Sequence, residues 1–429
     1  RKGIFNINVI PVMAGSALQN RGVINLMNEI VKYMPQAAER RELPADDLKK
    51  DDVVGITCDE NGALAAQVFK TAVDPFVGKL NYLRVNRGVL KAGMTVYNPN
   101  TDTQERISSL YVVNGKKQEA VSELKAGDIG AVAKLVNTGT GDTLCDPNHA
   151  VKFDPISFPK PVLYMAVTAK QRGQEDKVFA GLNRIAEEDP TFQVVKDMQT
   201  GETLAGGMGE VHLDVVQKKL KSNFGAEAVF KLPVIAYKET IRGKSNAEGK
   251  YKKQTGGHGQ YGHCKMRFEP TEKDFEFAEE IVGGTVPKQY IPAVEKGITE
   301  CLSRGVLAGY PVIRIKATLY DGSYHDVDSS EAAFKAAAEL AFREGMKNAS
   351  PVLLEPISRL RIAVPEQYLG DVLGDLNKRR GRILGMDAQD EMQIVTAEAP
   401  KAEILTYATS LRSMTQGRGR FTETFSRYE

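Results

Sequence analysis

Apolar positions recur at two different spacings along this chain, and the changes between them divide it into segments. Between residues 158 and 235 the pattern runs strand, helix, strand, strand, helix, strand, with helices expected at Gln174–Ala186 and Gly209–Phe224. Residues 357–429 repeat this order without repeating the sequence. Because that order is typical of ferredoxin-like β-α-β-β-α-β domains, two such domains are predicted.

The segments before and between these two domains have other patterns. Residues 53–157 carry short β-rich runs separated by turns, including the hairpin signal Asn114-Gly115, and they predict a small β-barrel. Residues 236–356 contain two helical patterns, Ile291–Ser303 and Ser329–Lys347, and Asp328 is expected to cap the second helix. The fold class predicted for the whole chain is therefore multidomain α+β.

The first 52 residues do not form a complete domain by themselves. Ile4–Val12 is predicted to be a buried strand, Gly15-Ser16-Ala17 a tight loop, and Asn20–Met34 a helix. One strand and one helix cannot form a stable layer, so we expect the tail of a domain whose body lies elsewhere. Residues 37–52 are polar and charged, as is typical of a linker.

Composition and charge exclude several classes of protein. Hydrophobic residues make up 42% and charged residues 26%, and 57 Lys+Arg balance 55 Asp+Glu, so any charged surface must be local. The 4 Cys form no C-x-x-C pair, and the sequence has no signal peptide and no membrane segment. These features favour a cytoplasmic protein without a disulfide framework or a membrane partner.

The motifs argue against an active site within this chain. Neither G-x-x-x-x-G-K-[ST] nor Asn-Lys-x-Asp occurs, so we expect these residues alone to bind no nucleotide. Gly257–Gly262 fits G-x-G-x-x-G, but a strand follows it rather than a helix, which argues against a dinucleotide site. Two groups have the residue types of a triad or a metal site: Ser323, His325 and Asp326, and His258, His263 and Cys264. The first group lies within one polar segment and the second lacks a fourth ligand at zinc spacing, so no catalytic residue and no metal site is predicted.

A basic hairpin is the most informative motif. From Arg242 to Arg267 the chain has seven Lys or Arg and one acid, Glu248, and its glycine-rich tip carries Gln260 and Tyr261. Lysines neutralise phosphates, aromatic rings stack on bases and glycines allow close approach of the backbone, so the tip is predicted to contact RNA.

A second basic run, Lys378-Arg379-Arg380, ends a predicted helix. It is interpreted equally well as an RNA contact or as a favourable interaction with the helix C-terminus.

Several longer motifs resemble bacterial translation elongation factor G. They include Gly256–Gly262 (GGHGQYG), Gly283–Pro292 (GGTVPKQYIP), Leu319–Glu331 (LYDGSYHDVDSSE), Asp375–Gly381 (DLNKRRG) and Phe425–Glu429 (FSRYE). The resemblance extends over essentially the whole chain. It implies the end of a GTPase domain, a β-barrel, a ferredoxin-like domain, a ribosomal-protein-like α/β domain and a second ferredoxin-like domain. The corresponding residues are 1–52, 53–157, 158–235, 236–356 and 357–429.

The resemblance also implies a function and a set of site residues. The full-length parent is expected to be a monomeric GTPase that binds GTP or GDP with Mg and promotes translocation of tRNA and mRNA on the ribosome. Gly15, Ser16 and Ala17 would be the remnant of its guanine-contacting loop. The residues expected to contact rRNA, ribosomal proteins, tRNA or mRNA are Gly256, Gly257, His258, Gly259, Gln260, Tyr261, Gly262, Ser323, Tyr324, His325, Lys250, Lys252, Lys253, Lys378, Arg379 and Arg380.

Two alternative functions are considered beside this one. A paralogue acting in ribosome recycling or tetracycline protection would share the same layout. A stand-alone RNA-binding or scaffold protein belongs to another class, and the orphan strand and helix within Arg1–Met34 argue against it. In each case Asp321, Asp326 and Asp328 would repel phosphate, so they are expected to hold the shape of their loop.

Overall fold

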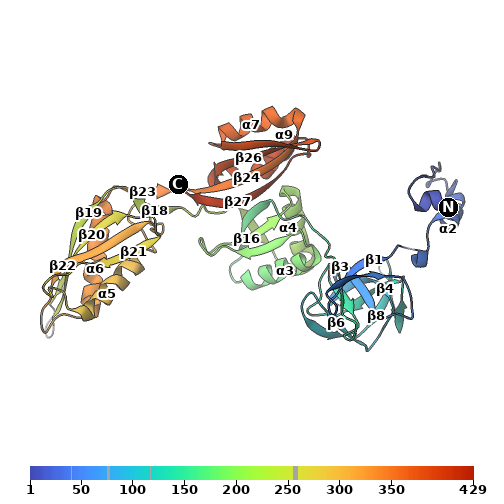
Figure 1. Cartoon of the computed structure of the whole chain (residues 1–429), viewed down its shortest axis with the longest axis horizontal. Coiled ribbons are helices and arrows are strands. Elements are labelled where there is room, and N and C mark those ends of the chain that lie inside the picture. The colour runs from blue at the N-terminus through green and yellow to red at the C-terminus, as the bar shows by residue number, and fades with distance from the viewer. Residues whose placement is uncertain (40, 75–77, 116, 255–258) are drawn as a thin grey trace. The chain divides into compact units, whose positions relative to one another are not determined.

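The computed structural model describes residues 1–39, 41–74, 78–115, 117–254 and 259–429. The chain divides into two compact units, one formed by residues 1–161, 168–194 and 211–229, the other by residues 162–167, 195–210 and 230–429. Figure 1 shows the helices and sheets of successive chain segments grouped into separate modules.

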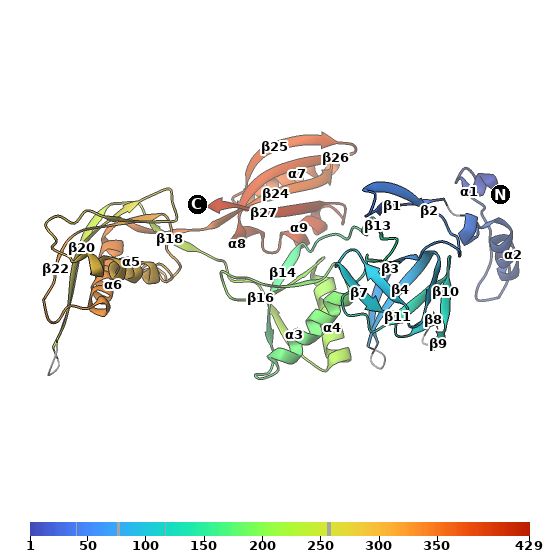
Figure 2. The same cartoon turned by 60° about the horizontal axis from the view of Figure 1, so that its bottom comes forward.

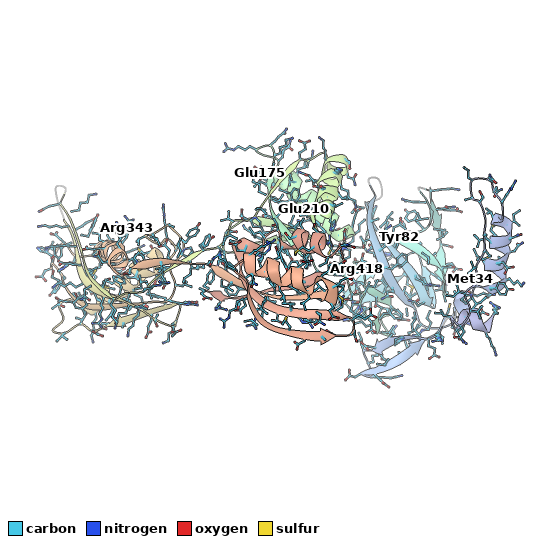
Figure 3. All side chains as sticks on the ribbon, turned by 90° about the horizontal axis from the view of Figure 1, so that it is seen from above. Met34, Tyr82, Glu175, Glu210, Arg343 and Arg418 are labelled. Carbon is cyan, nitrogen blue, oxygen red and sulfur yellow. The ribbon has the colours of Figure 1, made fainter. Side chains whose placement is uncertain are left out.

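The N-terminal segment contains the helices α1 (Lys2–Phe5), α2 (Val23–Tyr33) and η1 (Ala37–Glu39). The helix expected near Asn20–Met34 is confirmed as α2, and Met34 directly after it is labelled in Figure 3. The buried strand predicted at Ile4–Val12 is wrong, because no described residue pairs with this segment and a strand needs a paired neighbour. No residue of α2 is buried, and Val31 is 84% exposed.

The first β-rich module confirms the barrel-like arrangement. Its strands are β1 (Leu43–Asp47), β2 (Asp52–Ile56), β3 (Ala65–Asp74), β4 (Gly78–Arg87), β5 (Val89–Lys91), β6 (Thr95–Asn98), β7 (Thr103–Arg106), β8 (Leu110–Asn114), β9 (Lys117–Val121), β10 (Glu123–Lys125), β11 (Ile129–Ala133), β12 (Thr143–Cys145) and β13 (Val151–Phe153). An open sheet in the order β7-β6-β12-β3-β4-β11-β8-β9 curves around a core that includes Val68, Leu83 and Val132. Leu90 and Leu124, from the two-stranded sheet β10-β5, complete the same core.

Strand β1 lies in the segment that was expected to be a linker. It pairs antiparallel with β2 and with β13, and Ala45 contributes to a core with Ile56 and Phe153. The polar character of residues 37–52 hid this strand, because only its central residue Ala45 is buried.

Both ferredoxin-like predictions are confirmed by strand order. The first module consists of β14 (Leu163–Ala169), α3 (Glu175–Glu188), β15 (Gln193–Lys196), β16 (Thr203–Gly207), α4 (Glu210–Phe224) and β17 (Ala228–Lys231). The second consists of β24 (Pro356–Pro365), η3 (Glu366–Tyr368), α7 (Leu369–Lys378), β25 (Arg382–Gln389), β26 (Met392–Pro400), α8 (Lys401–Ile404), α9 (Tyr407–Met414) and β27 (Arg420–Tyr428). The sheets have the orders β15-β16-β14-β17 and β25-β26-β24-β27, so the first strand of each module lies between its third and fourth strands.

The central α/β module lies between them in sequence. Its elements are β18 (Lys238–Ile241), β19 (Ser245–Lys253), β20 (Gln260–Pro270), β21 (Phe275–Glu279), η2 (Lys288–Tyr290), α5 (Ile291–Cys301), β22 (Ile315–Ser323), α6 (Glu331–Asn348) and β23 (Pro351–Leu354). The main sheet has the order β19-β20-β22-β21, with β21 and β22 parallel. Helices α5 and α6 cover one face of this sheet (Figures 1 and 2), and the core lies between the two layers. Arg343, on the exposed side of α6, is labelled in Figure 3.

The start of α6 differs from the expected cap. Ser330 is the N-cap residue, and its side chain accepts a 3.2 Å hydrogen bond from the backbone N–H of Ala333. The prediction that Asp328 caps this helix is wrong, because the helix begins two residues later and the Asp328 carboxylate is used elsewhere.

Candidate nucleic-acid interface

Strands β20 and β22 bring two distant loops together at one end of the central sheet. We call residues 259–261 the first tip loop and Ser323–Ser329 the second tip loop. The N–H of Tyr261 donates a 2.8 Å hydrogen bond to the carbonyl of Asp328, and the Ser329 hydroxyl donates to the carbonyl of Tyr261 at 3.0 Å. The two loops therefore form one structural unit, as their positions beside neighbouring strands predicted.

The second tip loop presents two exposed rings and is shaped by its own polar groups. Tyr324 is 46% exposed and the His325 side chain is 56% exposed. The Nδ1 atom of His325 accepts hydrogen bonds from the backbone N–H groups of Val327 at 3.3 Å and Asp328 at 3.2 Å. Because Nδ1 is used inside the loop, Nε2 is the nitrogen of His325 that can meet a ligand.

The described glycines of the GGHGQYG motif lie where the fold leaves no room for a side chain. A Cβ atom on Gly262 would overlap the carbonyl of Ala333 in α6, and one on Gly249 of the neighbouring strand β19 would come even closer to the carbonyl of Ala337. Gly259 lies against the Asp328 carboxylate: a Cβ atom added to Gly259 would be 2.9 Å from the nearest oxygen of that carboxylate. These glycines allow α6 and the second tip loop to pack closely. Gly256, Gly257 and His258, which were also predicted to contact RNA, lie outside the described residues.

The lysines of the hairpin fall into two groups along its length. Near its base, Lys244 pairs with Glu269 at 2.6 Å and Lys265 pairs with Asp321 at 2.9 Å. Lys265 lowers the pKa of Asp321, and Lys244 lowers the pKa of Glu269. Near the tip, Lys250, Lys252 and Lys253 have no carboxylate within ion-pair distance in the described part of the chain. Uncompensated positive charge is therefore concentrated beside the tip loops.

The second basic run is held inside its own domain. Arg379 donates to Asp375 at 2.7 Å, to the carbonyl of Glu403 at 2.6 Å and to the Ser410 hydroxyl at 2.8 Å. Arg380 pairs with Glu355 at 2.6 Å and also with Glu403 at 3.1 Å. These partners favour the structural interpretation of Arg379 and Arg380.

Lys378 differs from its two neighbours. It is exposed and has no ion pair among the residues that the structure describes, so it is the member of this run that could reach a phosphate.

The loop expected to be the remnant of a guanine site forms a tight turn. Ser16 and Arg21 exchange two backbone hydrogen bonds of 3.0 Å, and the Ser16 hydroxyl accepts from the N–H of Gln19 at 3.3 Å. Gly15 and Ala17 on either side of Ser16 are exposed.

Sequence reasoning missed the polar cluster directly below the tip. His263 was considered only as a metal ligand, yet it lies on the outer sheet face while its neighbour Cys264 is buried in the core. His263 contacts Ser323, which also contacts Tyr261. The signal was present in the alternation of β20, which places residues 261, 263 and 265 on one face.

A histidine–aspartate contact joins two segments of the first ferredoxin-like module. The Nε2 atom of His212 lies 3.0 Å from Oδ2 of Asp189, and the ring of Phe192 contacts the His212 ring edge-on. The sequence segments Ala186–Phe192 and Gly206–Leu213 are therefore in contact through these side chains.

Within the described residues, no group of three or more His, Cys, Asp or Glu side chains is placed to hold a metal ion. No helix in the same residues is long and apolar enough to cross a membrane.

Comparison with known proteins agrees with the modules described above. Four family models match consecutive segments: elongation factor G domain 2 at residues 63–147, domain III at 158–232, domain IV at 233–350 and the elongation factor G C-terminus at 352–429. The chain is also similar to a crystal structure of a protein from Thermus thermophilus, with 40% sequence identity and a TM-score of 0.76. That similarity covers 95% of this chain, which spans 59% of the length of the Thermus protein. The chain belongs to the elongation factor G family.

Proposed function

We propose that this chain is the ribosome-binding part of a translational GTPase that promotes GTP-dependent translocation of tRNA and mRNA. The observation that carries the proposal is the convergence of the two tip loops beside Lys250, Lys252 and Lys253. Membership of the elongation factor G family supports it. The partners are then rRNA and ribosomal proteins, together with tRNA and mRNA, and the site of action is the cytoplasm.

The proposed division of labour follows from the residues present. The lysines beside the tip neutralise phosphates, and the exposed rings of Tyr324 and His325 offer stacking and hydrogen-bonding groups to bases or 2′-OH groups. Because the sequence has no phosphate-binding loop, GTP or GDP with Mg is assigned to a GTPase domain of the parent protein and not to these residues. Gly15, Ser16 and Ala17 would contribute the edge of that guanine site.

Ribosome binding by the chain itself tests the proposal. The dissociation constant for ribosomes is measured by sedimentation over a range of salt concentrations. Replacing Lys250, Lys252 and Lys253 with Ala should weaken binding and lower the slope of log affinity against log salt by about 2 to 3, since each phosphate contact contributes about 0.7 to 0.9.

The matched control uses cations of the same hairpin that already have carboxylate partners. Replacing Lys244 and Lys265 with Ala should leave that slope nearly unchanged. Equal losses of slope in both variants would contradict a phosphate contact localised to the tip. No binding of the unaltered chain to ribosomes would contradict the proposed function as a whole.

A further inference from the structure

A chain of polar contacts runs from a buried histidine to the exposed tip. The Nδ1 atom of His263 lies 2.7 Å from the hydroxyl oxygen of Ser323, and the hydroxyl of Tyr261 lies 2.8 Å from the same oxygen. The Tyr261 ring in turn lies 6.4 Å from the His325 ring, measured between centroids. His263 is only 8% exposed, whereas the His325 side chain is 56% exposed.

The tautomer of His263 with its ring proton on Nε2 gives these hydrogen bonds one direction. Nε2 lies 2.9 Å from a carboxylate oxygen of Glu248 on β19, a contact that favours a proton at Nε2 although the two atoms do not have hydrogen-bond geometry. Nδ1 then accepts the proton of the Ser323 hydroxyl, and the Ser323 oxygen accepts the proton of the Tyr261 hydroxyl. The nearest other charged groups on this face are Lys250 opposite His263, Lys252 opposite Tyr261, and Lys265, which pairs with Asp321.

This arrangement is not that of a hydrolase, although it contains Glu, His and Ser. The Ser323 hydroxyl is engaged by both Tyr261 and His263, so it is not presented to a substrate. Its position suits a cross-link between β20, which leads into the first tip loop, and β22, which leads into the second.

We propose that His263 is a positioning residue of the tip. His263 accepts the hydrogen bond of the Ser323 hydroxyl, and the Ser323 oxygen in turn accepts the hydrogen bond of the Tyr261 hydroxyl. His263 thereby fixes the ring of Tyr261 and keeps the two tip loops in register. Ser323, expected from the sequence to contact RNA, serves this internal cross-link instead. The effect on RNA binding rests on the proposed function, but the positioning itself does not.

Hydrogen–deuterium exchange of the complete chain tests the positioning without ribosomes. Ser323→Ala removes the bridging hydroxyl, and His263→Phe removes the acceptor while keeping a ring. Both should speed exchange in residues 259–263 and 323–330 about five- to tenfold, as expected for the loss of one intramolecular hydrogen bond. His263→Asn places an amide oxygen near the position of Nδ1 and should restore exchange to nearly the original rate.

The exchange of α5 provides the internal control. If α5 also exchanges faster in His263→Phe, the fold of that variant is disturbed. The exchange of Ser323→Ala then decides whether the hydrogen bond through Ser323 positions the tip. Unchanged exchange of the tip in Ser323→Ala would overturn the proposal. Exchange in a folded His263→Asn variant as fast as in Ser323→Ala would also overturn it.

Ribosome binding then separates this inference from the proposed function. His263→Phe should weaken ribosome binding severalfold without changing its salt dependence, because the three lysines beside the tip are unaltered. If the unaltered chain binds no ribosome, the proposed function fails, and the exchange measurements still decide whether His263 positions the tip. If exchange rises but ribosome binding is unchanged, His263 positions the loops without affecting the ligand contact, and that part of the inference is wrong.

Discussion

Oδ1 of Asp328 accepts a 2.9 Å hydrogen bond from the backbone N–H of Gly259. The two residues are 69 positions apart in sequence, and this bond joins the first tip loop to the second. A carboxylate at a site proposed to meet phosphate would otherwise be unfavourable, but here it accepts a hydrogen bond from a backbone N–H inside the tip. The Asp328 carboxylate is thus turned into the tip, whereas Asp326 is exposed and the basic groups lie beside the tip loops.

Removing the His325 side chain should slow translocation while leaving GTP hydrolysis nearly intact. The chain would be joined to a complete GTPase domain for this measurement. His325→Ala loses both the exposed ring and the acceptor for Val327 and Asp328, so single-round translocation should slow by about tenfold or more. His325→Asn keeps an acceptor for the loop and should give an intermediate rate.

The opposite pattern would contradict this assignment of the tip. Unchanged translocation together with reduced GTP hydrolysis would place the role of His325 in the nucleotide cycle. A factor acting in recycling or tetracycline protection would show little translocation even before His325 is changed.

Replacing the buried carboxylate of Glu239 should destabilise the central module. Glu239 is fully buried, and its two carboxylate oxygens accept hydrogen bonds from the N–H groups of Leu307 at 2.9 Å, Ala308 at 2.8 Å and Tyr310 at 3.0 Å. Glu239→Gln places an amide group against these donors and should lower the free energy of unfolding by about 2 kcal/mol. The free energy of unfolding of the central module is measured by hydrogen exchange of residues 236–356 at increasing urea concentrations.

The exposed Glu295 on α5 supplies a matched control for Glu239. Glu295→Gln should change the free energy of unfolding by less than about 0.5 kcal/mol. A similar small effect for Glu239→Gln would show that the loop from Leu307 to Tyr310 does not depend on the carboxylate.

Adding a methyl group at Gly262 should loosen the contact between α6 and the sheet. The new Cβ would overlap the carbonyl of Ala333, which belongs to the backbone and cannot move aside cheaply. Gly262→Ala should therefore lower the free energy of unfolding of the central module by about 1 to 3 kcal/mol, measured by the same urea titration.

Gly374 on α7 is the contrasting position. A Cβ there meets no atom within 4 Å, so Gly374→Ala should stabilise the C-terminal module by up to about 1 kcal/mol. An unaffected Gly262→Ala variant would mean that α6 does not pack as closely on β20 as described.

The stability of the C-terminal module should depend on Glu398 at acid pH. Hydrogen bonds lower the pKa of Glu398 from 4.5 to about 2; the largest effect comes from Arg427, and smaller effects come from Ser426 and Arg359. A carboxyl group with a lower pKa in the folded state stabilises the fold above its unfolded pKa. That stabilisation should be lost as pH falls from about 4.5 to about 2.

Thermal unfolding of the chain at a series of pH values checks this dependence. Glu398→Gln should flatten the change in unfolding temperature of the C-terminal module over that pH range. Glu366→Gln, at an exposed position in the same module, should leave the change intact. An identical pH dependence with and without the Glu398 carboxylate would contradict its contribution.

Local pattern was sufficient for much of the architecture. The order of strand and helix periodicities in residues 158–235 and 357–429 predicted two ferredoxin-like modules, and the strand orders agree. Such predictions succeed because burial of one face of a helix or sheet imposes its spacing on nearby residues. The lysine-rich hairpin was equally visible, since β19 and β20 are consecutive strands.

Contacts between distant residues were decided only by the tertiary structure. The sequence alone could not show that Arg379 is held by Glu403 and Ser410, or that Gly262 faces a helix far along the chain. It could not show that Ser323 lies between Tyr261 and His263 either. The spacing of a side chain restricts the face on which it lies, but its partner depends on which elements pack together. That packing is cooperative over the whole module, so the inward role of Asp328 and the outward role of His325 emerge only when the sheet is assembled.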